Sequence, residues 1–243
     1  MRVAVVVFPG SNCDRDAGHG IDDVLGTGTA EFVWHGESDL RGADAVVLPG
    51  GFSYGDYLRC GALARVSPIM SAVRQAAHAG VPVLGICNGF QVLCEAGLLP
   101  GALLRNDHGQ FRCDVVPLRV CTTRTPWTSG LQLGQSVRLP IAHGEGRYHA
   151  DPHTLQRLLA EDRIVLVYEG ENPNGSVAHI AGICSEDRNV VGMMPHPERA
   201  VHAWLGGTDG RAVLASILRS TLADDRRSAP VILEEAAHVP AHV

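Results

Sequence analysis

Short, almost entirely apolar runs alternate with amphipathic stretches over the first hundred residues of this chain. Strands that are apolar on both faces are typical of a parallel sheet, and the stretches between them suit crossover helices. The pattern therefore predicts an α/β fold with a mostly parallel open sheet and helices on both faces. The expected strands are residues 3–8, 31–34, 45–48 and 81–86, and the expected helices are residues 14–25, 68–79 and 90–96.

The pattern changes between residues 100 and 185, where shorter apolar segments are separated by turn signals such as Asn172-Pro173-Asn174-Gly175. Such spacing favours antiparallel strands, so we expect a small antiparallel extension of the same domain. The expected strands of this extension are residues 115–120, 137–142, 164–168 and 178–183. A last buried strand is expected at residues 189–194, and a closing helix at residues 211–222. The predicted domain covers residues 1–223, and residues 224–243 are expected to form a poorly ordered tail.

Composition removes several classes of function. The 243 residues carry a net charge of −6, and all twenty basic residues are arginine. Without lysine, Schiff-base chemistry and a Walker-type phosphate loop are excluded. No basic cluster or long apolar stretch is present, so we expect no nucleic-acid partner and no membrane association. Seven irregularly spaced cysteines without a Cys-x-x-Cys pair favour neither a metal site nor disulfides, and a cytoplasmic location is predicted.

The candidate nucleophile is Cys87, in the sequence Gly85-Ile86-Cys87-Asn88-Gly89. A strand precedes it and a helix follows it, which is the Gly-x-nucleophile-x-Gly turn of α/β hydrolases with Cys in place of Ser. Such a turn holds the sulfur at a helix N-terminus, where the free N–H groups favour a thiolate. The alternative is a small buried thiol that packs beneath the helix. We interpret the other six cysteines either in this way or as inert thiols at the surface.

A thiol nucleophile needs a base, and twelve histidines are available. His196 follows the apolar strand at 189–194, so it lies at the same carboxyl edge of the sheet as Cys87. Flanking prolines predict an extended segment in which His196 and Glu198 point the same way, so that the carboxylate orients the imidazole. The predicted catalytic residues are therefore Cys87, His196 and Glu198, the alternative being an exposed turn at 195–198.

A glycine-rich segment follows the strand at 45–48 and also lies at this edge of the sheet. Adjacent glycines let backbone N–H groups approach a substrate oxygen, and we expect the N–H groups of Gly51 and Asn88 to form an oxyanion hole. A plain tight turn is the alternative. No metal site is expected.

These motifs resemble the class I, or triad, glutamine amidotransferases. The resemblance begins with Gly85-x-Cys87-x-Gly89-x-Gln91 and the Pro-His-Pro-Glu sequence at 195–198, and it spans about residues 1–222. Within that family, further segments resemble the glutaminase subunits of phosphoribosylformylglycinamidine synthases: residues 8–14, 49–59, 143–146, 192–199 and 208–210. The fold that this implies is the flavodoxin-like amidotransferase domain.

The resemblance implies that Cys87 forms a thioester with glutamine and that ammonia passes to a large, ATP-dependent synthetase subunit, with a small third subunit in the complex. It implies no cofactor in this chain, ATP and Mg²⁺ being expected on the synthetase. The substrate contacts that it implies are Gln91, Phe52, His143 and Gly144. It leaves open whether Asp56 and Arg59 meet substrate or partner.

Three other functions are alternatives. A glutaminase that serves another synthetase differs in the segment 51–59. A cysteine peptidase or deglycase-like protein usually takes its base from beside the Cys, where this chain has Asn88. A non-catalytic descendant of an amidotransferase is expected to lose Cys87, His196 or Glu198, and all three are present.

Overall fold

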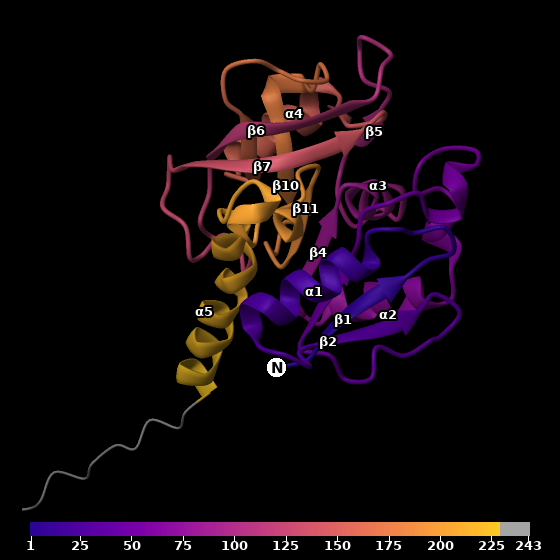
Figure 1. Ribbon diagram of the computed structural model, residues 1–243, viewed down its shortest axis with the longest axis vertical. Helices are drawn as coiled ribbons and strands as arrows, with labels where there is room; N and C mark the ends of the chain where they lie inside the picture. The colour runs from indigo at the N-terminus through magenta and orange to yellow at the C-terminus, as the bar shows by residue number, and fades with distance from the viewer. Residues whose placement is uncertain (229–243) are drawn as a thin grey trace, which may run out of the picture.

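A single nine-stranded sheet runs through the computed structural model, which describes residues 1–228 and the side chains of residues 1–219 (Figure 1). The first five strands in sheet order pair in parallel, and the other four continue the sheet antiparallel. In sheet order the strands are β2 (Ala30–Trp34), β1 (Val3–Val7), β3 (Ala45–Leu48), β4 (Val83–Ile86), β11 (Val190–Met193), β10 (Ile180–Cys184), β9 (Ile164–Tyr168), β6 (Arg112–Val120) and β7 (Ser136–His143).

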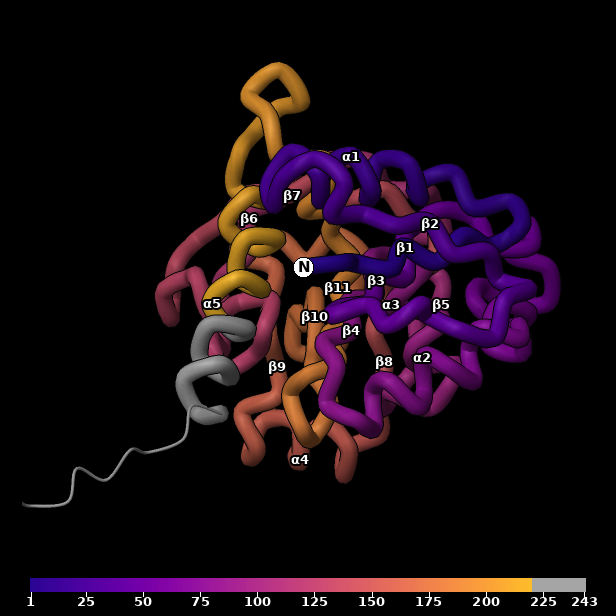
Figure 2. The backbone as a smooth tube through the Cα atoms, turned by 90° about the horizontal axis from the view of Figure 1, so that it is seen from below, coloured from indigo at the N-terminus to yellow at the C-terminus, as the bar shows by residue number. Residues whose placement is uncertain are grey.

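Helices cover both faces of the parallel half. Helices α1 (Asp14–Leu25) and α5 (Gly210–Ser228) contact each other on one face. Helices α2 (Ile69–His78) and α3 (Asn88–Glu95) lie on the other face, where both contact the short turn Ala64–Val66. Figure 2 shows α1 and α2 on opposite sides of the central strands. This arrangement confirms the predicted α/β class and the antiparallel extension.

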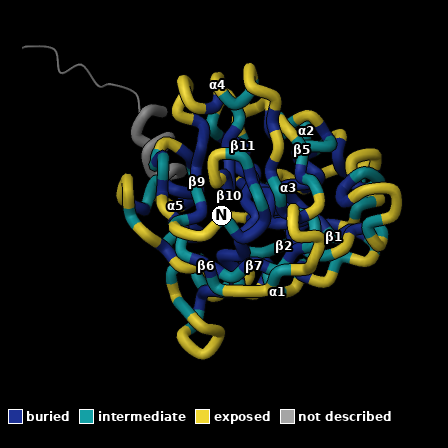
Figure 3. Tube along the Cα trace, turned by 90° about the horizontal axis from the view of Figure 1, so that it is seen from above, coloured by how far each residue is buried: buried dark blue, intermediate teal, exposed yellow. Residues whose placement is uncertain are grey.

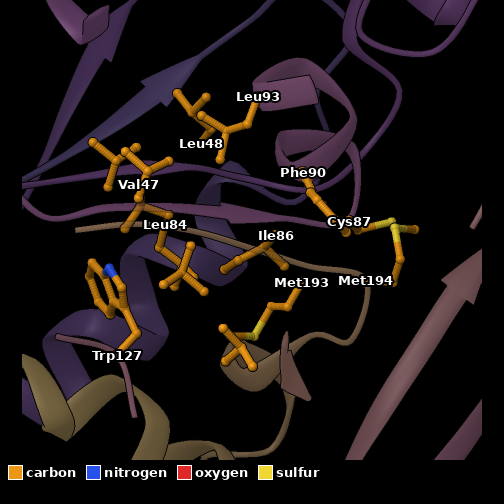
Figure 4. Close-up of a cluster of buried hydrophobic side chains, with 14 of the residues drawn as sticks. Val47, Leu48, Leu84, Ile86, Cys87, Phe90, Leu93, Trp127, Met193 and Met194 are labelled. Atoms are coloured by element: carbon orange, nitrogen blue, oxygen red, sulfur yellow. The ribbon is translucent and has the colours of Figure 1, made fainter. Parts of the chain in front are cut away.

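The core is built from the strands that the apolar runs predict. Val3, Val5 and Val47 are fully buried, and dark blue segments gather near the middle of the molecule in Figure 3. Figure 4 shows Cys87 at one end of a buried cluster that includes Phe90 and Met194. The nucleophile candidate therefore lies where the packed core meets the carboxyl edge of the sheet, which is where open α/β sheets bind ligands.

Three elements were not predicted. Helix α4 (Pro152–Ala160) lies in the antiparallel half, and β5 (Ala102–Leu104) pairs with β8 (Arg147–His149) in a separate two-stranded sheet. The helix carries a start signal, because the Asp151 side chain accepts hydrogen bonds from the backbone N–H groups of His153 and Thr154 and proline occupies the first turn. Strands of three residues give too little pattern to be recognised.

Several expected boundaries were wrong; β6, for example, begins at Arg112 instead of residue 115. Residues Val177–His179 form a 3₁₀ turn, with positive φ at Ala178 and His179, and the strand that was expected from residue 178 begins at Ile180. Helix α5 continues to Ser228 instead of ending at residue 222. The rest of the predicted tail, residues 229–243, lies outside the described residues. Within residues 1–228, no helix combines the length and apolar composition that crossing a bilayer requires.

Candidate active site

Cys87 occupies the sharp turn between β4 and α3 that the sequence predicts. Its φ of 49° and ψ of −103° are unusual for a residue with a side chain, and α3 begins at the next residue. Steric constraints explain why Gly85 and Gly89 flank this turn. A Cβ at Gly89 would overlap the Leu48 carbonyl oxygen, and one at Gly85 would lie 2.6 Å from the Gly89 oxygen. Glycine at these two positions thus lets α3 pack directly against β3 and β4.

His196 and Glu198 form a buried pair. The imidazole Nδ1 lies 2.6 Å from the Glu198 Oε1, and both side chains are almost completely buried. The segment is not extended as expected, because Pro197–Arg199 forms a single 3₁₀ turn. That turn places the carboxylate beside the ring all the same. Helices α1 and α5 both contact this turn and hold it in place.

The pair and the thiol share one small volume. A Cβ added at Gly50 would lie 2.7 Å from His196 Cε1 and 3.4 Å from Cys87 Cβ. The His196 Nε2 atom is buried and has no partner of hydrogen-bonding geometry among the described residues. Burial disfavours the imidazolium, yet the neighbouring Glu198 and Cys87 outweigh burial and raise the pKa of His196 above its ordinary value. The structure therefore brings the three predicted catalytic residues together.

The glycine-rich loop is supported from the segment that follows β1. The Ser11 hydroxyl donates to the Gly50 carbonyl oxygen at 3.0 Å, and Gly51 has a φ of 114°. A Cβ at Gly51 would lie 2.7 Å from the Asn12 backbone nitrogen, so only glycine fits this contact. Gly51 and the half-exposed Phe52 both line the cavity beside Cys87.

Asn88 connects the loop to α3. Its Oδ1 accepts from the Ser53 N–H at 3.3 Å, and its Nδ2 donates to Asp56 at 3.2 Å and to the Gln91 Oε1 at 2.9 Å. The Gln91 Nε2 in turn donates to the Glu145 carbonyl oxygen at 2.7 Å. Gln91 lines the cavity, whereas the Asn88 side chain is buried behind the wall. This network fixes the position of the Asn88 backbone N–H next to Cys87.

His143 and Gly144 also lie in the cavity wall, at the end of β7. The His143 Nδ1 lies 3.2 Å from the Asn106 Oδ1, and Nε2 lies 3.5 Å from the Asn174 Nδ2. Burial lowers the pKa of His143 to about 4. A neutral His143 that donates from Nδ1 to Asn106 is consistent with both contacts.

These residues surround a cavity of about 340 Å³, at the lower end of the roughly 300–1,000 Å³ range of small-molecule sites. Sequence reasoning missed part of its lining: Asn12, Cys13, Cys60, Phe111, Ala142 and Arg199. Asp56, whose role was left open, and Glu145, which the resemblance places at the border of the site, line the cavity as well. Asn12 and Cys13 follow the carboxyl end of β1, so the sheet-edge rule was the available signal for them. In the described part of the chain, no three His, Cys, Asp or Glu side chains are grouped so as to hold a metal ion.

Three free cysteines, Cys13, Cys60 and Cys87, line the same cavity. Burial raises the pKa of Cys13 to about 12, although Arg199 opposes the effect. Burial and the Asp56 and Glu145 carboxylates raise the pKa of Cys60. Both thiols are therefore held in the protonated, poorly nucleophilic form, and neither has a histidine pair beside it.

A second cavity, of about 990 Å³, lies between α1, the β6–β7 hairpin and the segment after β11. It is larger, but neither Cys87 nor His196 lines it. Because the thiol and the imidazole are the groups that can do chemistry, the smaller cavity is the candidate active site. Glu198 and Arg199 are in contact with the larger cavity as well.

Comparison with known proteins agrees with this geometry. Residues 1–209 match the CobB/CobQ-like glutamine amidotransferase domain family. The chain is 55% identical over 223 residues to phosphoribosylformylglycinamidine synthase subunit PurQ of a Nostoc species, covering 92% of this chain and 99% of the relative. It is 58% identical over 218 residues to the PurQ subunit of Rubrobacter xylanophilus, covering 90% and 98%. The chain belongs to the PurQ family.

One chain of the solved structure of PurLQS from Thermotoga maritima superposes on this chain with a TM-score of 0.83. The two are 45% identical, and the match covers 90% of this chain and 98% of that chain. A glutamine amidotransferase from the same organism has a TM-score of 0.54 at 16% identity, over 96% and 88%, and shows the fold alone. These matches confirm the predicted amidotransferase fold and the resemblance that was drawn from the motifs.

Proposed function

We propose that this PurQ-family chain hydrolyses L-glutamine and delivers the ammonia to an ATP-dependent synthetase subunit of phosphoribosylformylglycinamidine synthase, in purine biosynthesis. One observation carries the proposal: a strained turn holds the Cys87 thiol in the same cavity as the buried His196–Glu198 pair. A nucleophile, a base and an orienting carboxylate are the three parts that acyl transfer requires.

In the first half-reaction, His196 accepts the thiol proton and the Cys87 sulfur attacks the side-chain amide carbon of glutamine. The raised pKa of His196 favours the imidazolium, whose charge stabilises the neighbouring thiolate. The imidazolium then gives its proton to the departing nitrogen, so that ammonia leaves and a γ-glutamyl thioester remains. In the second half-reaction, His196 takes a proton from water and the hydroxide attacks the thioester carbon. The C–S bond breaks to release glutamate, and the imidazolium returns its proton to the Cys87 sulfur. Glu198 orients the ring throughout.

The oxyanion that forms in both steps needs hydrogen-bond donors. We assign this role to the N–H groups of Gly51 and Asn88, which the Asn12 and Asp56 contacts hold in place. One such donor contributes about 2.7–4 kcal/mol in known cases. Lowering a thiol pKa from about 8.5 to about 6.5 raises its thiolate fraction at pH 7 only ~25-fold, or roughly 2 kcal/mol. Thiolate formation alone is therefore the smaller contribution.

We assign substrate contacts to Gln91, Phe52, His143 and Gly144, because all four line the cavity. The proposed partners are a large synthetase subunit together with a small third subunit, and the PurLQS structure of Thermotoga maritima supports this assignment. ATP and Mg²⁺ belong on the synthetase in this proposal, and this chain needs no cofactor. A cytoplasmic location stays a prediction.

The test is Cys87→Ala in the reconstituted complex. Glutamine-dependent synthesis should fall at least about 10³-fold, because neither of the other two thiols in the described cavity wall has a histidine–carboxylate pair beside it. Synthesis from added ammonium salts should persist, because that reaction bypasses the thioester. The matched control is Cys113→Ala, which removes an exposed thiol on β6 and should leave both activities intact. Loss of both activities in a folded Cys87→Ala variant would refute the proposed role.

A glutaminase that serves a different synthetase, and a peptidase or deglycase-like enzyme, were the alternatives. The identity of 55–58% to PurQ subunits over most of the chain argues against both. The source of the base argues further against a peptidase or deglycase-like enzyme, because His196 comes from the end of β11 and not from beside Cys87.

A further inference from the structure

The charges in the wall of the catalytic cavity are unevenly distributed. Among the described residues that line it, Arg199 is the one arginine, and Asp56 and Glu145 are the two carboxylates. The two histidines do not supply a free positive charge for a ligand. Burial lowers the pKa of His143 to about 4, and His196 is paired with Glu198. The guanidinium of Arg199 is thus the permanent cation that a ligand in this cavity meets.

Hydrogen bonds hold the Arg199 side chain in place but do not use all of its N–H donors. Its Nε donates to Asp16 at 3.1 Å and its Nη2 donates to the Cys13 sulfur at 3.0 Å. A guanidinium has five N–H groups, and the remaining three make no hydrogen bond to any described residue. The side chain is about two-thirds buried, with a relative exposure of 32%. A held guanidinium with unused donors is suited to a carboxylate, which it can bind through two parallel hydrogen bonds.

Asp56 and Glu145 form the complementary group. Both interact with the Cys60 thiol, and Asp56 also accepts from the Asn88 side chain. Neither carboxylate forms an ion pair within the described residues, since the neighbouring Arg59 pairs with Glu95 at 2.6 Å. Burial raises the pKa of Asp56, with a contribution from Glu145. The Arg59 charge also acts on Glu145, but Arg59 forms its ion pair with Glu95.

Cys87 adjoins neighbours of both groups. It interacts electrostatically with Cys13, which contacts Arg199, and it precedes Asn88, which contacts Asp56. A ligand whose amide group reaches the Cys87 sulfur therefore shares the cavity with one cation and two carboxylates. The two charged groups of an α-amino acid match this distribution.

We propose that Arg199 binds the α-carboxylate of the amino-acid substrate and that Asp56 and Glu145 accept hydrogen bonds from its α-ammonium group. The inference rests on the proposed glutaminase function and adds the residues that determine specificity. It differs from a purely structural role, in which Arg199 only ties the segment after β11 to α1 through Asp16. A structural role would affect every substrate equally, whereas a binding role affects only substrates that carry the group in question.

The experiment measures kcat/KM for ammonia release by the reconstituted complex with three amides. They are L-glutamine, 4-aminobutanamide, which lacks the α-carboxylate, and 4-carbamoylbutanoate, which lacks the α-ammonium group. The Arg199→Gln variant should lower the glutamine to 4-aminobutanamide ratio at least about tenfold, or ~1.4 kcal/mol. Arg199→Lys, which keeps the charge, should retain most of the ratio. Asp56→Asn should lower the glutamine to 4-carbamoylbutanoate ratio at least about tenfold.

Arg119→Gln is the matched control, because Arg119 is exposed on β6 and pairs with Glu169 away from the cavity. It should leave both ratios unchanged. An unchanged ratio in either Arg199→Gln or Asp56→Asn, with all substrates slowed by one factor, would overturn the proposal. That outcome is distinct from failure of the proposed function, which would be seen as glutamine turnover that survives in the Cys87→Ala complex.

Discussion

At the scale of single residues, surroundings distinguish chemically identical side chains. Cys13, Cys60 and Cys87 line one cavity, yet only Cys87 lies on a strained turn at a helix N-terminus beside a histidine. Burial and nearby carboxylates raise the pKa of Cys60, and burial raises that of Cys13. His143 and His196 differ in the same way. Burial lowers the pKa of His143, whereas Glu198 and Cys87 outweigh burial and raise the pKa of His196.

His143 gives a pH-dependent prediction. Its folded-state pKa of about 4 lies below the ordinary value of 6.5, so the unfolded chain binds the proton more readily. The stability that neutral His143 contributes is therefore present above pH 6.5 and is lost as the pH falls from 6.5 towards 4, by up to about 3 kcal/mol.

Urea denaturation of the wild type and His143→Gln checks this prediction. Between pH 7 and pH 4, the free energy of unfolding of the wild type should fall by about 2–3 kcal/mol more than that of the variant, because glutamine has no proton to take up. A difference that stays constant with pH would contradict it.

At the scale of secondary-structure elements, the active site depends on how closely α3 approaches the sheet. Gly89 is in contact with the Leu48 carbonyl oxygen of β3, and Gly85 is in contact with α3 itself. The loop after β1 supports Gly50 and Gly51, and α1 and α5 hold the turn that carries Glu198. Four connections at the carboxyl edge of the parallel half therefore share one rigid frame.

Gly89→Ala tests this frame. The added Cβ would overlap the Leu48 carbonyl oxygen, so α3 must move away from β3. We expect the free energy of unfolding to fall by about 3 kcal/mol or more, with loss of glutaminase activity. The control is Gly207→Ala, whose Cβ would meet no atom within 4 Å and which should change stability by less than about 0.5 kcal/mol. A Gly89→Ala protein of wild-type stability would contradict the packing argument.

The limits of sequence-based prediction follow from these contacts. The expected helix at residues 14–25 and the expected strand at 45–48 match α1 and β3, because buried apolar runs and amphipathic stretches carry a strong pattern. The convergence of Cys87, His196 and Glu198 was predictable because each of them follows a strand of the parallel half. Arg199 and Cys13 were not recognised as part of the cavity, since their approach depends on packing between segments that lie 186 residues apart. Helix α4 was missed although Asp151 and Pro152 mark its start.

At the scale of the whole molecule, one sheet unites two halves with different tasks. The parallel half supplies Cys87, the glycine-rich loop and the His196–Glu198 turn. The antiparallel half supplies His143, Gly144 and Glu145 as the opposite part of the cavity wall. The fold of the PurQ family explains how these residues are positioned around the cavity. The proposed partner subunits explain where the ammonia is used.

The central claim is that the Cys87 sulfur forms a covalent bond with the substrate. Acid quenching of the complex a few milliseconds after mixing with glutamine, followed by mass spectrometry of this chain and its peptides, measures that bond. We predict an adduct with the mass of one glutamyl group on the peptide that contains Cys87, and its absence from Cys87→Ala. Glutamine turnover with no adduct, or an adduct on Cys13 or Cys60, would contradict the account.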